Sequence, residues 1–265
     1  MRGAPHLRDR GGGALISLRG QRALVTGGSR GIGAATAELL AECGADVAVG
    51  YRSRAADAEA VVDRCRELGV RAFAHAADLS KSDEVDALFG RVERELGGLD
   101  LFVGNAGIWP PADVPLAEMT DAQWLRTMAE NVDAMFLTTR AALRLIGSGG
   151  RVVLVGSTAG QRGEAGHADY AASKGAMISF VKSLCVEVGR RDVTVNCVAP
   201  GWVDTEMTSA AMRDGGRERI AANIPIGRVA TPRDIAGPIV FLCSDLARHV
   251  TGEILNVNGG SVLCG

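Results

Sequence analysis

Short apolar segments alternate with helix-forming segments from residue 21 onward, and this alternation restricts the fold more than any other feature of the sequence. Strands are predicted at Arg22–Thr26, Asp46–Gly50, Val70–His75, Leu99–Val103, Arg151–Val155, Val193–Val198 and Glu253–Val257. Helices are predicted at Gly31–Cys43, Ala55–Leu68, from a cap at Ser80–Ser82 to Leu96, Asp121–Ile146, Asp169–Gly189 and Pro232–Cys243. Strands that alternate with helices favour a parallel sheet covered on both faces. We therefore expect an α/β protein with a doubly wound, seven-stranded parallel sheet and helices on both faces.

The same alternation runs without a linker or a change of composition, which predicts a single domain over residues 20–265. Residues 1–19 are rich in glycine and arginine and lack periodicity, so we expect a flexible N-terminal tail there.

Charge and cysteine usage exclude several classes of protein. The formal net charge is only −2, which gives no sign of a nucleic-acid or membrane partner. The six cysteines are widely scattered and form no closely spaced cluster with histidines, so we expect reduced thiols and no metal site. No apolar run approaches the roughly 18 residues of a membrane span. These features predict a cytoplasmic protein.

A glycine-rich loop, T-G-G-S-R-G-I-G, lies between the first predicted strand and the first predicted helix, at Thr26–Gly33. Glycines allow a tight turn and a close approach to a pyrophosphate, and the helix N-terminus offers free N–H groups to an anion. The spacing differs from G-x-G-x-x-G because Thr36 stands where the third glycine would be. A dinucleotide site is the preferred interpretation, and an ordinary tight turn is the alternative.

The end of the second predicted strand indicates which dinucleotide is preferred. A site for NAD usually has an acidic residue there, but this chain reads Gly50-Tyr51-Arg52-Ser53-Arg54 and has no carboxylate before Asp57. Arg30 and Arg52 could instead pair with a ribose 2′-phosphate, because guanidinium groups suit phosphate oxygens. We predict NADP(H) as the cofactor, with two solvated arginines as the alternative.

Tyr170 and Lys174 are four residues apart, which places them on one face of a helix. A neighbouring positive charge favours the phenolate, so the tyrosine becomes a usable proton donor nearer neutral pH. Ser157 follows the fifth predicted strand, at the sheet edge where doubly wound folds bind ligands. If the Tyr170–Lys174 pattern is considered alone, the simpler interpretation is that these are two side chains on the protein surface.

The motifs of the chain and their order resemble those of the single-domain short-chain dehydrogenase/reductase family, and the resemblance covers nearly all of residues 21–260. The family has a Rossmann fold. The matching motifs are Thr26–Gly33, Asn105-Ala106-Gly107, Asn131, Ser157, Tyr170, Lys174, Pro200-Gly201, Thr251-Gly252 and Val257–Gly260. One departure is Gly104, which replaces the usual first asparagine before Asn105-Ala106-Gly107.

The resemblance implies roles for four catalytic residues. Tyr170 would be the general acid, or the base in the reverse direction. Lys174 would lower the pKa of the tyrosine and bond the nicotinamide ribose. Ser157 would bond the substrate oxygen. Asn131 would hold a water that links Lys174 to solvent, and a buried amide in a helix kink is the alternative.

The resemblance also implies a set of cofactor contacts. Asp78 and Leu79 would contact the adenine, although a simple turn is the alternative for Asp78, and Pro200 to Val203 with Thr205 would approach the nicotinamide. The predicted set comprises Gly27, Ser29, Arg30, Gly31, Ile32, Gly33, Arg52, Ser53, Asp78, Leu79, Asn105, Ala106, Gly107, Tyr170, Lys174, Pro200, Gly201, Val203 and Thr205.

Within the family, the chain is most similar to bacterial 3-oxoacyl-[acyl-carrier-protein] reductases of fatty acid biosynthesis. A sugar or secondary-alcohol dehydrogenase is the alternative activity, and a non-catalytic dinucleotide-binding regulator is the alternative of another class. Predicted substrate contacts are Ser157, Trp109, Gln161, His167, Trp202 and Met207. Packing residues are the alternative for the tryptophans, and a surface position is the alternative for His167.

Partners follow from the same resemblance. An acyl carrier protein could deliver the substrate, but Leu137 follows Phe136 where these reductases often have an arginine; Arg140 and Arg191 lie nearby. We also expect a mobile lid at residues 204–228 and a homotetramer packed through the long helices and the last strand.

Overall fold

Seven parallel strands form one sheet, in the order β3-β2-β1-β4-β5-β6-β7. This computed structural model describes residues 15–263. The strands are β1 (Arg22–Thr26), β2 (Asp46–Tyr51), β3 (Ala72–Ala76), β4 (Leu99–Gly104), β5 (Ile146–Val155), β6 (Thr194–Pro200) and β7 (Ile254–Val257). The order reverses between β1 and β4, so the expected doubly wound sheet is confirmed.

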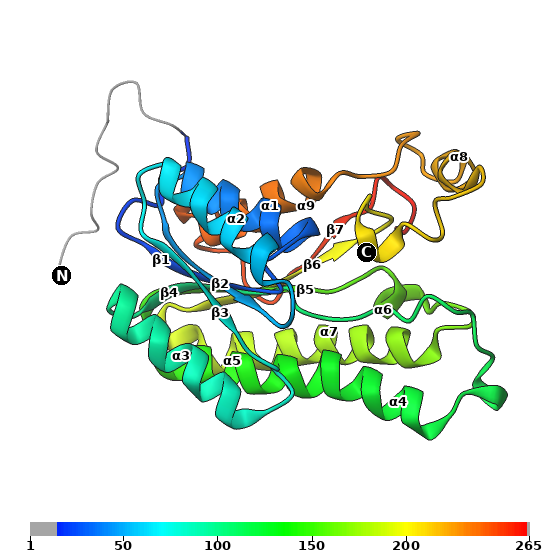
Figure 1. The fold of residues 1–265 in the computed structure, drawn as a ribbon, viewed down its shortest axis with the longest axis horizontal. Coiled ribbons are helices and arrows are strands. Elements are labelled where there is room, and N and C mark those ends of the chain that lie inside the picture. The colour runs from blue at the N-terminus through cyan, green and yellow to red at the C-terminus, as the bar shows by residue number, and fades with distance from the viewer. Residues whose placement is uncertain (1–14, 264–265) are drawn as a thin grey trace.

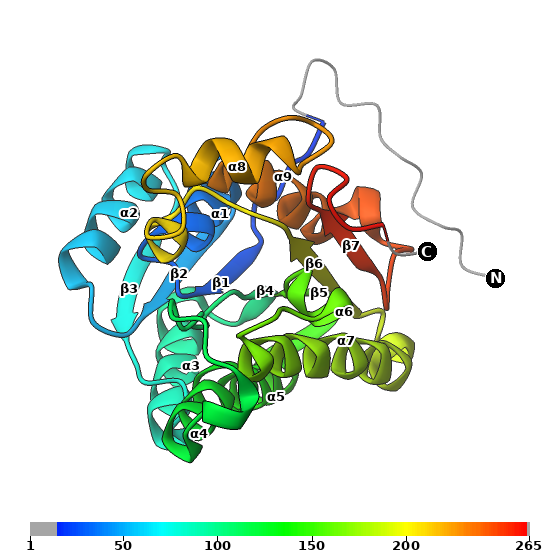
Figure 2. The same cartoon turned by 90° about the vertical axis from the view of Figure 1, so that its right-hand side faces the viewer.

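Helices cover both faces of the sheet (Figures 1 and 2). The longer helices are α1 (Gly31–Glu42), α2 (Ala55–Glu67), α3 (Ser82–Leu96), α4 (Asp121–Met128), α5 (Ala134–Leu145), α7 (Ala168–Val188) and α9 (Pro232–Cys243). Two short helices are α6 (Ala159–Arg162) and α8 (Gly216–Ala222). Figure 1 shows α1, α2 and α9 on one face of the sheet and α3, α5 and α7 on the other. None of the helices in the described part of the chain is long and apolar enough to cross a membrane.

Each face of the sheet has its own apolar core. On one side, side chains such as Val25 and Val49 pack against Leu40 of α1 and Ile239 of α9. On the other, Leu24 and Phe102 pack with residues of α3, α5 and α7. Burial on both faces explains why the strands read as continuous apolar runs rather than as alternating ones.

Local signals set several helix ends. Thr231 caps α9 by accepting a hydrogen bond from the Asp234 N–H at 3.3 Å, and the Asp234 side chain accepts from the Thr231 N–H at 2.7 Å. Gly97 ends α3 in the left-handed conformation, with φ 83°. These ends agree with the predicted helices to within a residue or two.

Three predictions about element bounds are corrected. The single helix expected at Asp121–Ile146 is interrupted by a π-helical turn, Ala129–Asp133, between α4 and α5. Strand β5 begins at Ile146 rather than Arg151, because Ile146 pairs with Leu99 before a register shift. Strand β3 begins at Ala72 rather than Val70.

The predicted tail boundary at residue 19 is also corrected. Leu18 is buried, its N–H donates to the Cys43 carbonyl oxygen at 2.8 Å, and Ile16 packs against the core. Ile16 and Leu18 therefore pack with the domain, and residues 1–14 of the predicted tail lie outside the described residues.

Candidate active site

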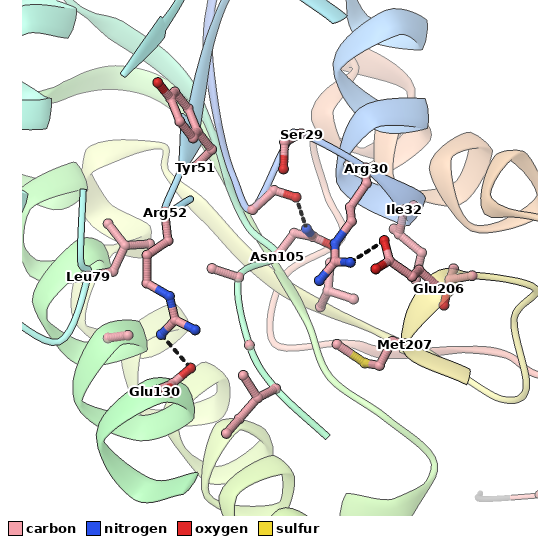
Figure 3. Close-up of a pocket in the computed structure, with 18 of the residues that line it drawn as sticks. Ser29, Arg30, Ile32, Tyr51, Arg52, Leu79, Asn105, Glu130, Glu206 and Met207 are labelled. Carbon is pink, nitrogen blue, oxygen red and sulfur yellow. Dashed lines mark hydrogen bonds and ion pairs between the residues drawn. The ribbon is translucent and has the colours of Figure 1, made fainter. Parts of the chain in front are cut away.

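A pocket of about 300 Å³ opens at the carboxyl ends of the strands. It is lined by the loop after β1, the end of β2, and the residues that follow β3, β4, β5 and β6. Figure 3 shows the part of it between the glycine loop and Glu130. All predicted cofactor residues line it except Gly33, and among the predicted substrate residues Ser157 and Met207 do so.

The glycine loop is packed so tightly that its glycines cannot carry side chains. A Cβ on Gly33 would lie 2.2 Å from the Gly27 carbonyl oxygen and 2.6 Å from Asn105 Nδ2. Gly27 and Gly31 have φ angles of 62° and 55°, which favour glycine. Asn105 holds the loop from the other side, because its Nδ2 donates to the carbonyl oxygens of Thr26 and Gly27 at 3.0 and 3.1 Å.

Helix α1 begins at this loop without a side-chain cap and without an acidic residue in its first turn. Its first N–H groups and its dipole are therefore free to meet an anion. The close backbone packing and the uncapped helix end together fit the pyrophosphate of a dinucleotide.

Three arginines surround the part of the pocket near β2. Arg52 pairs with Glu130, with 2.7 Å between Nη1 and Oε2, and Arg30 pairs with Glu206 (Figure 3). Arg54 also pairs with Glu206. The predicted residues Arg30 and Arg52 are thus at the pocket, but they are ion-paired rather than merely solvated. Sequence reasoning missed Arg54, Glu130 and Glu206, although all three line the pocket.

Ser157, Tyr170 and Lys174 meet at the inner end of the pocket. Both Ser157 and Tyr170 line the pocket, and the Ser157 hydroxyl is close enough to Tyr170 to lower the pKa of its phenol. Lys174 is buried, and its Nζ donates to the Val155 carbonyl oxygen at 2.8 Å and lies 5.8 Å from the centroid of the Tyr170 ring. The tertiary structure thus brings together three groups that the sequence places on two different elements.

The pKa values in this structure differ from the sequence-based expectation. Burial raises the pKa of Tyr170 to about 12, although the nearby Ser157 side chain opposes this rise. Burial also lowers the pKa of Lys174 to about 8. The expected lowering of the tyrosine pKa by Lys174 is therefore not seen in the chain alone, because removal of water from both groups has the larger effect.

We predict a pH dependence of stability that comes from Lys174. Between pH 8 and the unfolded pKa of about 10.4, the unfolded chain binds a proton at Lys174 that the folded chain does not. The free energy of unfolding of the wild type should therefore rise over this window by about 2 kcal/mol relative to Lys174→Met. Urea titrations at several pH values measure this difference.

The comparison with Lys174→Met is needed because other buried groups act in the opposite direction. Burial raises the pKa values of Cys65 and Cys197 to about 11, so the folded chain keeps protons that the unfolded chain loses at lower pH. The contribution of these thiols to the free energy of unfolding therefore falls as the pH rises. A constant difference between the two proteins from pH 7 to 10 would contradict the assignment to Lys174.

Asn131 is buried in the π-helical turn between α4 and α5. Its Oδ1 accepts from the Ile108 N–H at 2.8 Å, and its Nδ2 donates to the Ile108 carbonyl oxygen and to Ser173 Oγ, both at 3.0 Å. This pattern matches the alternative of a buried amide at a kink. It ties the loop after β4 to helix α7 close to Tyr170, and the water-holding role stays a prediction.

Asp78 lies both in a turn and at the pocket. Its Oδ1 accepts from the Ser80 N–H at 3.2 Å and from Ser80 Oγ at 2.7 Å, which lowers the pKa of the carboxyl group. The structure therefore contains the turn that was the alternative to adenine binding, and adenine binding stays a prediction.

Four predicted substrate residues lie outside the pocket lining. Trp109 stacks on His167, with 4.8 Å between ring centroids, and meets Trp202 edge-on at 6.1 Å. His167 is buried and its Nε2 donates to the Pro110 carbonyl oxygen at 2.9 Å, so the surface alternative is wrong. Gln161 donates from Nε2 to Asn256 Oδ1 at 2.8 Å.

Sequence reasoning missed other residues of the lining. They are Tyr51, Arg54, Ala77, Ser80, Ile108, Glu130, Ala134, Val155, Gly156, Glu206 and Thr208. Several of these residues end a strand or directly follow one, so their place at the carboxyl edge of the sheet could have identified them as pocket residues. Glu130 comes from the π-helical turn and Glu206 from a 3₁₀ turn after β6, where no sequence motif marked them.

Known proteins resemble this chain over almost its whole length. A family model described as Enoyl-(Acyl carrier protein) reductase matches residues 27–261. The chain is 42% identical to 3-oxoacyl-[acyl-carrier-protein] reductase FabG of Vibrio cholerae and 38% identical to that of Escherichia coli K12, in each case over 92% of this chain and 98% of the relative. A solved short chain dehydrogenase from Burkholderia cenocepacia in complex with NADP is 40% identical, with a TM-score of 0.87 over 92% of this chain and 98% of the other.

Proposed function

Because the chain belongs to the short-chain dehydrogenase/reductase family, we propose that it is an NADP(H)-dependent oxidoreductase that acts on a carbonyl or secondary-alcohol carbon. The observation that carries this proposal is the meeting of Ser157, Tyr170 and Lys174 at the inner end of a pocket with an uncapped helix at its glycine loop. The solved relative in complex with NADP supports the choice of cofactor.

The roles of the side chains follow from this geometry. The nicotinamide supplies or accepts the hydride when it is bound. In reduction, the Tyr170 hydroxyl donates its proton to the substrate oxygen, and Ser157, which lines the pocket beside Tyr170, donates a second hydrogen bond to the same oxygen. The Lys174 ammonium group, 5.8 Å from the tyrosine ring, favours the phenolate that remains.

We propose a 3-oxoacyl thioester, carried by an acyl carrier protein, as the substrate. Support comes from the FabG relatives, which are 38–42% identical over 92% of the chain. Leu137 stands where such reductases often have an arginine. Close to it on α5, the Arg140 guanidinium lies over the Phe136 ring, 4.8 Å from its centroid. The Arg191 side chain is exposed but donates to the Leu143 and Ile146 carbonyl oxygens, at 3.0 and 2.5 Å, which leaves Arg140 as the better candidate for an acidic carrier.

A substrate panel tests the function. We expect acetoacetyl thioesters, free and on a carrier protein, to be reduced with kcat/KM about tenfold or more above that of sugars and simple ketones, and NADPH to be preferred over NADH by a similar factor. The measurement is steady-state oxidation of each cofactor. Faster oxidation of a sugar or a secondary alcohol would favour the alternative dehydrogenase activity, and a preference for NADH would contradict the cofactor assignment.

We further propose a homotetramer in the cytoplasm. Exposed apolar side chains on α4 and α5, among them Leu125 and Phe136, support contacts between subunits through these helices. Light scattering after size-exclusion chromatography would measure the assembly, and a monomer at micromolar concentration would contradict it.

A further inference from the structure

The segment after β6 crosses the pocket above the glycine loop. Thr205 lies against Gly31, where a Cβ would meet Thr205 Cγ2 at 3.3 Å. Residues Glu206–Thr208 form a single 3₁₀ turn that begins with a capping box on Thr205. The backbone thus holds Glu206 beside the loop in which Arg30 lies.

The Glu206 carboxylate joins two arginines from distant parts of the sequence. One oxygen, Oε2, pairs with Arg30 of the glycine loop, and the other, Oε1, lies 2.6 Å from Arg54 Nη2 at the start of α2. Both arginines, Arg30 first, hold the pKa of Glu206 below its usual value. Glu206 therefore occupies the position of an anion shared by Arg30 and Arg54 (the Arg30 contact is drawn in Figure 3).

These ion pairs are easily exchanged. The Glu206 side chain is 54% exposed and the two arginines are about half exposed, at 47% and 51%. Exposed ion pairs are weak, and a phosphate ester carries more charge and more acceptor oxygens than a carboxylate. A phosphate at the pocket mouth can thus take both guanidinium groups from Glu206.

Arg52 is held differently. Its partner Glu130 is only 16% exposed and also pairs with Arg126, with 3.1 Å between Nε and Oε1. Arg52 is therefore the less available of the three arginines, and Arg30 with Arg54 form the pair that already shares one anion.

We propose that Glu206 competes with the 2′-phosphate of the adenosine ribose for Arg30 and Arg54, and so sets how strongly the protein distinguishes phosphorylated from unphosphorylated dinucleotides. This inference rests on the proposed preference for NADP(H).

The test uses two ligands without nicotinamide, 2′,5′-ADP and 5′-AMP, which differ only in the 2′-phosphate. We expect Glu206→Gln to bind 2′,5′-ADP about three- to tenfold more tightly than the wild type by isothermal titration calorimetry, and 5′-AMP within about twofold of it. The matched control is Glu218→Gln, which removes the same charge from an exposed, unpaired position of α8 and should change neither affinity by more than about twofold. An unchanged or weaker affinity of Glu206→Gln for 2′,5′-ADP, or an equal gain for both ligands, would overturn the proposal.

A second variant tests the competition itself. Arg54→Gln should weaken binding of 2′,5′-ADP, and more strongly in the Glu206→Gln background than in the wild type, because in the wild type Arg54 must first leave Glu206. Equal losses in the two backgrounds would count against competition. A wild-type protein that binds 5′-AMP as tightly as 2′,5′-ADP would instead overturn the NADP(H) preference, together with this inference, so the two failures are distinguishable.

Discussion

Replacement of Tyr170 by phenylalanine should lower kcat by about 10²- to 10⁴-fold, the range that general acid–base catalysis contributes. Tyr170 lines the pocket beside Ser157, and the other tyrosine of the chain, Tyr51, lies at the end of β2. The ring remains, so packing is kept, and the loss of the hydroxyl should reduce the free energy of unfolding by only about 1 kcal/mol. Initial rates of NADPH oxidation and a urea titration measure the two effects.

Ser183→Ala is a suitable control for this variant. Ser183 is an exposed residue of the same helix, α7, so its replacement removes a hydroxyl without touching the pocket. We expect its kcat to stay within about twofold of the wild type. A Tyr170→Phe protein that retained more than about a tenth of the wild-type kcat would show that another group supplies the proton.

Replacement of Gly33 by alanine should have the second large effect, on cofactor binding and on stability together. The added Cβ would lie 2.2 Å from the Gly27 carbonyl oxygen and 2.6 Å from Asn105 Nδ2, so the loop must move away from α1. Overpacking of this kind costs about 1–3 kcal/mol of folding free energy. Displacement of the loop from the helix N-terminus should weaken NADPH binding by about 100-fold or more.

The control for this variant is Gly237→Ala in α9, where an added Cβ would meet nothing within 4 Å. Alanine is the better helix former, so this change should raise the free energy of unfolding by about 0.5–1 kcal/mol and leave NADPH binding unchanged. Fluorescence titration with NADPH and chemical denaturation compare the two variants. Wild-type affinity for NADPH in Gly33→Ala would show that the loop can relax around the methyl group.

The fold was predictable because its signals are local. Strands that are buried on both faces need continuous apolar runs, which are visible in the sequence. The start of a capped helix such as α9 is likewise marked by its capping residues. The errors lie where tertiary contacts override local preference. Asn131 is drawn toward Ile108 and Ser173 at the π-helical turn, and the pairing of Ile146 with Leu99 extends β5 beyond its apolar core.

The candidate site was predictable in part for the same reason. Residues at the carboxyl ends of strands, such as Ser157 and Asn105, are placed at the pocket by the topology of a parallel sheet. Trp109, His167 and Trp202 were predicted to contact the substrate, but they pack on one another and lie outside the lining, so this contact stays a prediction. Which of two neighbouring loops an indole faces depends on packing, which a sequence pattern does not encode.

The doubly wound sheet and the glycine loop could be predicted from the sequence, because they depend on periodicity and on spacing within one or two elements, whereas the roles of Ser157, Tyr170 and Lys174 came from the family resemblance of the motifs. The tertiary structure decided the electrostatics. Removal of water from Tyr170 and Lys174 moves both pKa values in directions that the spacing alone did not suggest. The tertiary structure also brings Glu206 to Arg30 and Arg54, which are 176 and 152 residues away from it in the sequence. Ion pairing depends on distance in space, and only the folded chain sets that distance.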